Sequence, residues 1–408
     1  MADNNSQKIP SGYKQTEIGV IPADWDVKRL GDIVQFNNGK AHERFIDDKG
    51  DYIVVNSKFI STAGEVFKNS FENLSPLSDG DIAMVMSDIP NGKALAKCFF
   101  IEKNGKYTLN QRICAFKSNG SDSLYLFYKL NRNKYFLDFD SGVGQTNLKK
   151  SEVLDCPVAL PADKKEQTSI ATALSDADIL IKKLEKLIEK KKNIRLGSMQ
   201  ELLTGKRRLA GFSGKWKIKK LGEVANVIGG GTPTTSVIYY WNGDINWFTP
   251  TEIGIDKYVY ESRRKITIEG LKNSSAKILD EGTILLTSRA GIGDLAILKV
   301  KASTNQGFQS LVPINDTDSE FLYYLMLTKK DALLEKASGS TFLEISPNNV
   351  RAIELMMPEP TEQIAIATVL SDMDTEIEKL ESQLTKYQNI KQGMMQTLLT
   401  GKIRLLTK

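Results

Sequence analysis

The sequence predicts two globular regions of mixed α/β structure, joined by two long helices that form an antiparallel intramolecular coiled coil. Three observations predict this fold: a long internal repeat, a heptad spacing of apolar residues inside the repeat, and short apolar runs separated by Gly and Asn elsewhere. Because both halves contain the same elements in the same order, we expect a pseudo-two-fold relation between them. The length of 408 residues allows two to three domains.

The internal repeat sets the domain organisation. Residues 166–209 and 362–405 align without a gap at a constant offset of 196 positions, and 26 of their 44 positions are identical. The regions in front of the two copies are alike only in places, such as 25–33 with 216–224 and Leu109-Asn-Gln111 with Thr304-Asn-Gln306. We therefore predict a first globular domain at 1–160, a first repeated helix at 161–209, a second globular domain at 210–360 and a second repeated helix at 361–408.

Each repeated segment is predicted to be one long helix. Its apolar residues alternate steps of four and three, the period of a coiled coil. Thr204-Gly205 and Thr400-Gly401 mark the helix ends, because glycine is the usual residue just after a helix. A helix of about 38 residues would be on the order of 57 Å long. The predicted seam comprises Ile170, Leu174, Ala177, Ile181, Leu184 and Ile188 in the first helix, and Ile366, Leu370, Met373, Ile377, Leu380, Leu384 and Tyr387 in the second.

The matching helix in the same chain gives this seam its partner. Pairing of two like helices, each followed by a globular domain or the chain end, is most simply antiparallel, and it would place the globular domains at opposite ends. Lys391 interrupts the second seam. Within the globular domains, apolar runs at 52–55, 81–86, 283–287 and 295–298 predict short strands.

Composition excludes several classes of protein. Cys98, Cys114 and Cys156 are too few and too widely spaced for a disulfide framework, so a reducing cytoplasm is expected. A single histidine, His42, argues against a zinc site or a histidine-based nucleophilic triad. The N-terminal residues are polar, unlike a signal peptide, and no stretch approaches 18 uninterrupted apolar residues.

Catalytic motifs are missing as well. The glycine-rich run at 229–235 lacks the Gly-Lys-Ser/Thr ending of a phosphate loop, and Gly291-Ile-Gly293 is not a dinucleotide fingerprint. No Asn/Asp-Pro-Pro-aromatic run of an amino-methyltransferase is present. We therefore expect a protein that is not an enzyme and holds no metal.

Binding chemistry is better represented, because basic and amide residues cluster in loops of both globular domains. Arg and Lys suit guanine edges, Asn and Gln suit adenine, and all of them can bind phosphates. Two diverged sets of such loops favour a DNA-binding function. The candidates are Lys40, His42, Arg44, Asn56, Lys58, Asn91, Lys93, Gln145 and Asn147 in the first domain, and Thr232, Thr234, Thr235, Arg263, Arg264, Lys265, Ser288, Arg289, Ser340 and Thr341 in the second.

The net charge of +5 comes from one segment of the chain rather than from its whole length. Residues 161–209 hold 12 basic and 7 acidic residues, whereas 1–160, 210–360 and 361–408 are each balanced. The excess therefore lies on the first repeated helix and its Lys206-Arg-Arg208 tail. It is either a solvated face or a surface for DNA phosphates or an acidic partner.

Several stretches resemble the specificity subunits of type I restriction-modification systems. They are GYKQTEIGVIPADW at 12–25, EQxxIATxLSD at 166–176 and 362–372, LLTGKxRL at 202–209 and 398–405, and GGTP at 230–233. The resemblance covers essentially the whole chain, in the order domain, helix, domain, helix.

The resemblance implies a non-catalytic subunit in which each globular domain is a target recognition domain for one half of a bipartite, asymmetric site in double-stranded DNA. The coiled coil would set the spacer and dock two methyltransferase subunits, and two restriction/translocase subunits would join for cleavage. S-adenosylmethionine, ATP and Mg²⁺ would all be bound by these partner subunits in the bacterial or archaeal cytoplasm. Two alternatives stay open: a coiled-coil scaffold without sequence-specific DNA contact, and a self-contained nuclease or methyltransferase.

Overall fold

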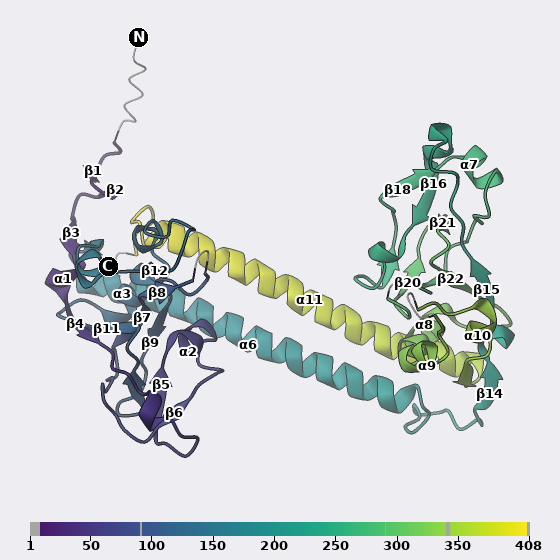
Figure 1. The fold of residues 1–408 in the computed structure, drawn as a ribbon, viewed down its shortest axis with the longest axis horizontal. Coiled ribbons are helices and arrows are strands. Elements are labelled where there is room, and N and C mark those ends of the chain that lie inside the picture. The colour runs from purple at the N-terminus through teal and green to yellow at the C-terminus, as the bar shows by residue number, and fades with distance from the viewer. Residues whose placement is uncertain (1–8, 90–91, 290, 340–342, 406–408) are drawn as a thin grey trace, which may run out of the picture. The chain divides into compact units, whose positions relative to one another are not determined.

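The computed structural model describes residues 9–89, 92–289, 291–339 and 343–405. It divides into two compact units, of which unit 1 comprises residues 1–185 and 383–408 and unit 2 comprises residues 186–382. Each unit therefore contains one globular domain together with one end of each long helix (Figure 1). This division follows from antiparallel helix pairing, because the start of one helix then lies beside the end of the other.

The long helices are α6 (Lys164–Leu202) and α11 (Pro360–Leu398), each of 39 residues, which confirms the predicted length. Gly205 and Gly401 follow them with φ of +68° and +72°, the left-handed conformation that ends a helix. In unit 2, Lys191 pairs with Glu376 at 2.7 Å and Arg195 pairs with Asp374. The acidic partner has a lower residue number in α11 when the basic residue has a higher number in α6, so the helices run antiparallel.

The predicted seam residues are all buried or half-buried, but they do not form one uniform seam. Ile170 and Leu174 pack into the core of unit 1, whereas Ile366 and Leu370 pack into the core of unit 2. Towards the middle of the helices, Leu184, Ile188 and Ile377 are buried. The ends of the helices therefore contribute to the globular cores, where the start of each long helix packs with the end of the other.

The globular part of unit 1 is built on a four-stranded antiparallel sheet, of order β4-β11-β7-β9, and a three-stranded sheet, of order β10-β5-β6. Every residue of β7 is buried, which explains its reading as an apolar run. The strands are β1 (Tyr13–Thr16), β2 (Gly19–Pro22), β3 (Trp25–Arg29), β4 (Val34–Asn38), β5 (Tyr52–Val55), β6 (Asn69–Ser70), β7 (Ile82–Val85), β8 (Ser87–Asp88), β9 (Cys98–Phe100), β10 (Tyr107–Leu109), β11 (Ile113–Ser118), β12 (Thr146–Asn147) and β13 (Pro157–Pro161). The helices are α1 (Leu30–Ile33), α2 (Ser57–Ser61), α3 (Ser123–Leu130), α4 (Lys134–Leu137) and α5 (Lys150–Leu154).

Unit 2 repeats this plan with a five-stranded sheet, of order β15-β22-β19-β20-β17, and a three-stranded sheet, of order β18-β16-β21. The predicted strands at 52–55 and 295–298 are confirmed as β5 and β20, and those at 81–86 and 283–287 contain β7 and β19. The strands of unit 2 are β14 (Lys217–Lys220), β15 (Ala225–Gly229), β16 (Trp241–Phe248), β17 (Tyr258–Val259), β18 (Arg264–Ile266), β19 (Ile284–Leu286), β20 (Leu295–Leu298), β21 (Ala302–Thr304), β22 (Gln309–Pro313) and β23 (Glu354–Met357). Its shorter helices are α7 (Ile268–Lys272), α8 (Ser319–Leu327), α9 (Lys330–Glu335) and α10 (Pro347–Arg351).

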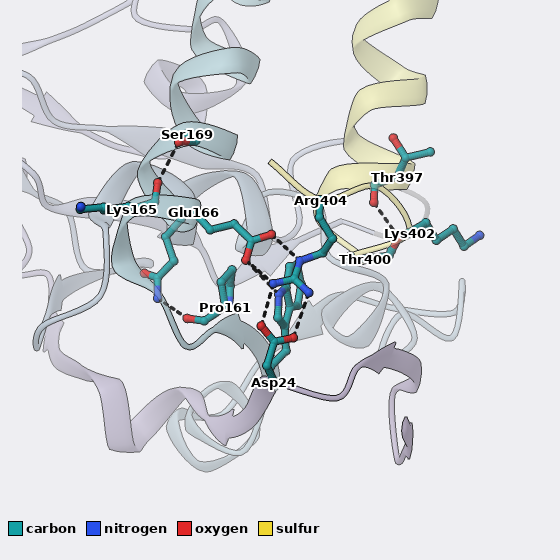
Figure 2. Close-up of polar contacts among 12 residues, drawn as sticks. Asp24, Pro161, Lys165, Glu166, Ser169, Thr397, Thr400, Lys402 and Arg404 are labelled. Atoms are coloured by element: carbon teal, nitrogen blue, oxygen red, sulfur yellow. Dashed lines mark hydrogen bonds and ion pairs between the residues drawn. The ribbon is translucent and has the colours of Figure 1, made fainter. Parts of the chain in front are cut away.

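A buried carboxylate joins three segments in unit 1. Glu166, at the start of α6, is 1% exposed and accepts a bond from Trp25 Nε1 at 3.3 Å. The guanidinium of Arg404 donates to both of its oxygens, at 2.5 and 2.8 Å, and also to Asp24 at 2.9 and 2.8 Å (Figure 2). These bonds to the Glu166 and Asp24 carboxylates raise the pKa of Arg404, and Arg404 lowers the pKa of Asp24.

Unit 2 contains the equivalent buried carboxylate, Glu362, at the same position of the second repeat. Glu362 is 1% exposed, accepts from Trp216 Nε1 at 3.1 Å and receives two bonds of 2.6 Å from Arg208. The arginine comes from the other repeat in each case, because Arg208 follows α6 and Arg404 follows α11. We call each set, Glu166–Arg404–Trp25 and Glu362–Arg208–Trp216, a carboxylate lock.

A second pair of contacts ties the helices to the domains. Tyr128 donates to Asp178 at 2.8 Å and Lys391 of α11 pairs with the same carboxylate. Tyr324, Asp374 and Arg195 form the equivalent set in unit 2. Lys391 therefore interrupts the apolar seam because it neutralises a carboxylate of the facing helix.

Part of the basic excess of the first repeated segment is paired inside the protein. Lys191 and Lys192 bind Glu376 and Glu381 of α11, at 2.7 and 2.6 Å. Arg208 of the basic tail belongs to the carboxylate lock. These three cations therefore have acidic partners within the chain, and the predicted alternatives, a solvated face or a surface for DNA phosphates or an acidic partner, apply to the other basic residues of this segment.

Removing the arginine of a carboxylate lock is expected to destabilise its unit strongly. Arg404→Ala removes the cation that pairs with the buried carboxylate of Glu166, and losing one partner of a buried ion pair costs about 3–5 kcal/mol. Arg29→Ala is the matched control, because Arg29 pairs with Glu17 with both side chains about half exposed, worth under about 1 kcal/mol. Urea unfolding followed by tryptophan fluorescence checks this, and equal midpoints for the two variants would contradict it.

Lys129 gives a prediction about pH. Its ammonium donates to the carbonyl of Leu399 at 2.6 Å, and burial lowers the pKa of Lys129 to about 8. Between pH 8 and the unfolded value near 10.5, the unfolded chain binds more protons, so this group makes folding more favourable as pH rises. Lys129→Leu, the residue found at the equivalent position 325, removes that contribution. We expect the stability of the variant relative to the unaltered protein to fall between about pH 8 and 10.5, whereas the exposed Lys134→Leu control shows no such trend.

Candidate nucleic-acid interface

Both globular domains contain the same pair of backbone hydrogen bonds around an Asn-Gln turn, and we call this arrangement the corner. In unit 1, Lys40 N donates to Leu109 O at 2.9 Å and Asn110 N donates to Val55 O at 3.1 Å. In unit 2, Gly231 N donates to Thr304 O at 2.9 Å and Asn305 N donates to Phe248 O at 3.1 Å. The Asn-Gln pairs that the sequence aligns, 110–111 and 305–306, therefore occupy equivalent places.

A glycine in each domain makes this corner possible. A Cβ atom at Gly39 would lie 1.9 Å from the carbonyl oxygen of Asn110, and one at Gly230 would lie 2.0 Å from that of Asn305. Any side chain there would displace the Asn-Gln turn. The corner is thus held by backbone, which leaves the side chains around it free to differ between the two domains.

In unit 1 the corner borders a cavity of about 320 Å³. The predicted candidates Asn56 and Lys58 line it, together with Asn110 and Gln111 of the corner. Gln111 Nε2 donates to Glu43 at 3.2 Å, and Asn56 Oδ1 accepts from Phe59 N at the start of α2. Cations and amides around one hollow suit base edges and phosphates. Sequence reasoning missed Lys68, Gln111 and Arg112 of this lining, although the Asn-Gln alignment marked the region.

The other candidates in unit 1 divide between exposed and engaged positions. Lys40, Arg44 and Lys93 are exposed. Gln145 Nε2 donates to Ser87 Oγ at 2.6 Å, and that hydroxyl donates to Asn147 Oδ1 at 2.6 Å, so the two amides form one exposed cluster beside β8. Asn91 lies outside the described residues.

His42 is not available to DNA. It is fully buried, its Nδ1 donates to the carbonyl of Lys40 at 2.7 Å, and its Nε2 accepts from the hydroxyl of Thr108 at 2.8 Å. Burial lowers the pKa of His42, in keeping with a neutral ring that bonds on both sides. Its role is to hold the loop after Gly39 against β10, and we leave it out of the interface.

In unit 2 the candidates also gather around the corner. Thr232 donates to Gln306 Oε1, and Ser288 N donates to Gly307 O at 2.8 Å. The side chain of Ser288 is fully buried, so its predicted contact with DNA is dropped. Thr234, Thr235, Arg263 and Arg264 are exposed, Lys265 pairs with Glu261, and Arg289 pairs with Glu344. Ser340 and Thr341 lie outside the described residues.

Over the described ranges, no three His, Cys, Asp or Glu side chains are grouped so that they could hold a metal ion. Nor is any described helix long and apolar enough to cross a membrane.

Comparison with known proteins decides what this pair of domains is. The sequence model of the type I restriction modification DNA specificity domain matches twice, at residues 22–192 and 213–387. The chain belongs to the family of type I restriction-modification specificity subunits. It is a non-catalytic DNA specificity subunit with two target recognition domains, as the sequence predicted.

Individual relatives agree with the family. The chain is 25% identical to the putative type I restriction enzyme MjaX specificity subunit of Methanocaldococcus jannaschii over 97% of both chains. It is 44% identical to the MjaIX specificity subunit of the same organism over 172 residues, which are 41% of this chain and 40% of that protein. The fold is similar to that of the specificity subunit from M. genitalium, with a TM-score of 0.62 and 16% identity over 92% of this chain and 96% of that one.

Proposed function

We propose that each globular domain reads one half of a bipartite, asymmetric site in double-stranded DNA. In this proposal residues 1–160 and 210–360 are the two target recognition domains, and the repeated segments 161–209 and 361–408 link them. The observation that supports this proposal is that both domains share the corner, whereas the side chains around it differ. A fixed backbone frame repeated in both domains, with Asn56 and Lys58 beside one copy and Thr232 and Arg264 beside the other, suits two readers of different sequences.

The helix pair is proposed to set the spacer between the half-sites. The carboxylate locks support this role, because each one fixes both helices to a globular domain through a buried carboxylate. Two domains that read unlike sequences need such a fixed linkage, since a flexible one would allow several spacers.

The same helices are proposed to dock two methyltransferase subunits. Their outer faces carry aliphatic side chains that water covers in the isolated chain: Ile179 is 48% exposed in unit 1, and Ile194 and Leu196 are 45% and 54% exposed in unit 2. Exposed apolar residues on otherwise charged helices are typical of partner surfaces. Two restriction/translocase subunits complete the proposed cytoplasmic complex, with S-adenosylmethionine, ATP and Mg²⁺ bound by these partners.

A methyl-transfer assay tests the proposed division of labour. The chain alone, incubated with S-adenosylmethionine and unmodified DNA, is expected to give no product, and the methyltransferase subunits alone should not select sites. The two together should methylate adenine at defined sequences. Turnover by the chain alone, or the same sites modified without it, would contradict the proposal.

The spacer role gives a second prediction. Deleting one heptad from each helix, residues 183–189 and 379–385, shortens both by roughly 10 Å, or about three base pairs of B-DNA. We expect the recognised spacer to shorten by that amount or binding to be lost. Deleting a single heptad from one helix only is the control for misaligned pairing. An active double deletion with an unchanged spacer would refute the role of the helices as a ruler.

A further inference from the structure

The small three-stranded sheets of the two domains can be superimposed residue by residue. β5 pairs in parallel with β10 and antiparallel with β6, and β16 makes the same pairings with β21 and β18. The corner anchors the comparison, because Asn110 N bonds to Val55 and Asn305 N bonds to Phe248. Val54 is therefore equivalent to Trp247, one residue earlier in each strand.

A basic residue lies opposite this position in both domains. Arg264 is the register partner of Trp247. In unit 1, the backbone N–H of Val54 donates to the carbonyl of Lys68 at 2.9 Å, which continues the pairing of Tyr52 with Ser70 and Ile53 with Asn69. Both Lys68 and Arg264 are exposed, and Lys68 lines the cavity beside the corner. A cation thus occupies the same register position of the small sheet in both domains, whereas the neighbouring residues differ.

The guanidinium of Arg264 lies against two tryptophan rings. Its guanidinium carbon lies 3.8 Å from the centroid of the Trp241 ring and 5.6 Å from that of Trp247. The indoles are themselves fixed, because Trp247 Nε1 donates to Gly231 O at 2.8 Å and Trp241 Nε1 donates to Thr234 O at 3.3 Å. Those carbonyls belong to the loop that contains Thr232, so the stacked guanidinium is anchored to the same corner. Stacking orders the planar fork before any ligand arrives.

The N–H donors of the Arg264 guanidinium have no acceptor within the part of the chain that the structure describes. Among the described residues no hydrogen bond or ion pair is made by the Arg264 guanidinium. Its neighbours differ. Lys265 is neutralised by Glu261 at 2.8 Å. The backbone N–H of Arg263 bonds to Glu252, and no aromatic ring of the described residues lies beneath the Arg263 side chain. Of these three basic side chains, only that of Arg264 is both ordered by aromatic rings and left without a hydrogen-bond acceptor among the described residues.

We infer that Arg264 is a specificity-determining residue that reads a guanine in the half-site of the second domain, and that Lys68 contacts DNA at the equivalent place in the first. This rests on the proposed function. A planar fork with two parallel N–H donors matches O6 and N7 of guanine, whereas a phosphate needs no such fixed plane. Lys68 has no indole beneath it in the cavity lining, so the two domains place different chemistry at one shared position.

The test maps methylated adenines in DNA from cells that express the full chain, or its variants, with the methyltransferase. The second half-site of the unaltered protein is expected to contain a guanine. Arg264→Ala should relax that one position by roughly 5- to 150-fold, the value of a bidentate contact. The first half-site and the spacer should not change. Lys68→Ala should affect the first half-site alone, and the control Lys301→Ala, which removes an exposed cation of unit 2 that pairs with Asp280, should leave the motif intact.

Other outcomes overturn the inference in distinguishable ways. Uniform loss of methylation at all sequences, with a smaller salt dependence of binding, would make Arg264 a phosphate contact. An unchanged motif would make the stack purely structural. If Arg264→Ala fails to fold, Arg264→Lys decides, because it keeps a cation over the indole but lacks the fork and should relax the same position. A guanine-free second half-site overturns the inference alone, whereas the absence of any bipartite motif in the unaltered protein overturns the proposed function.

Discussion

The buried carboxylates Glu166 and Glu362 determine how the two long helices pair and how each globular unit is completed. Each is almost fully buried at the start of a long helix and is neutralised by an arginine that follows the other helix. Neither globular unit is complete without the end of the opposite repeat, so the two helices must pair antiparallel for either carboxylate to be satisfied. A buried charge tolerates little movement, because losing its partner costs several kcal/mol.

Stability and recognition are thereby assigned to different parts of the sequence. The locks, the Tyr–Asp–cation contacts and the corner glycines are repeated in both units, and they consist of buried or half-buried charged groups or of backbone. The side chains around the corner are exposed and differ between the domains. A specificity subunit built this way can change the bases it reads without changing the frame that holds the reading residues.

The sequence predicted the helices and the order of domains closely, because a gapless repeat and heptad spacing are local signals. It did not predict the lock, since Glu166 and Arg404 lie 238 positions apart and meet only through antiparallel pairing. For the same reason Arg208 and Lys191 read as free charge, although the folded chain pairs them. Candidate base-reading loops were found from residue type alone. That signal cannot separate exposed Lys40 from buried His42 two positions later, nor can it reveal that Trp241 lies beneath Arg264.

We propose that this one chain carries two DNA-reading domains at a fixed separation. Single-molecule sequencing of methylated adenines, in DNA from cells that express this chain with its methyltransferase, tests it most directly. The account predicts one motif of two unlike half-sites with an adenine modified in each, separated by a constant number of unspecified bases. A palindromic or contiguous motif, or half-sites at variable separation, would contradict it.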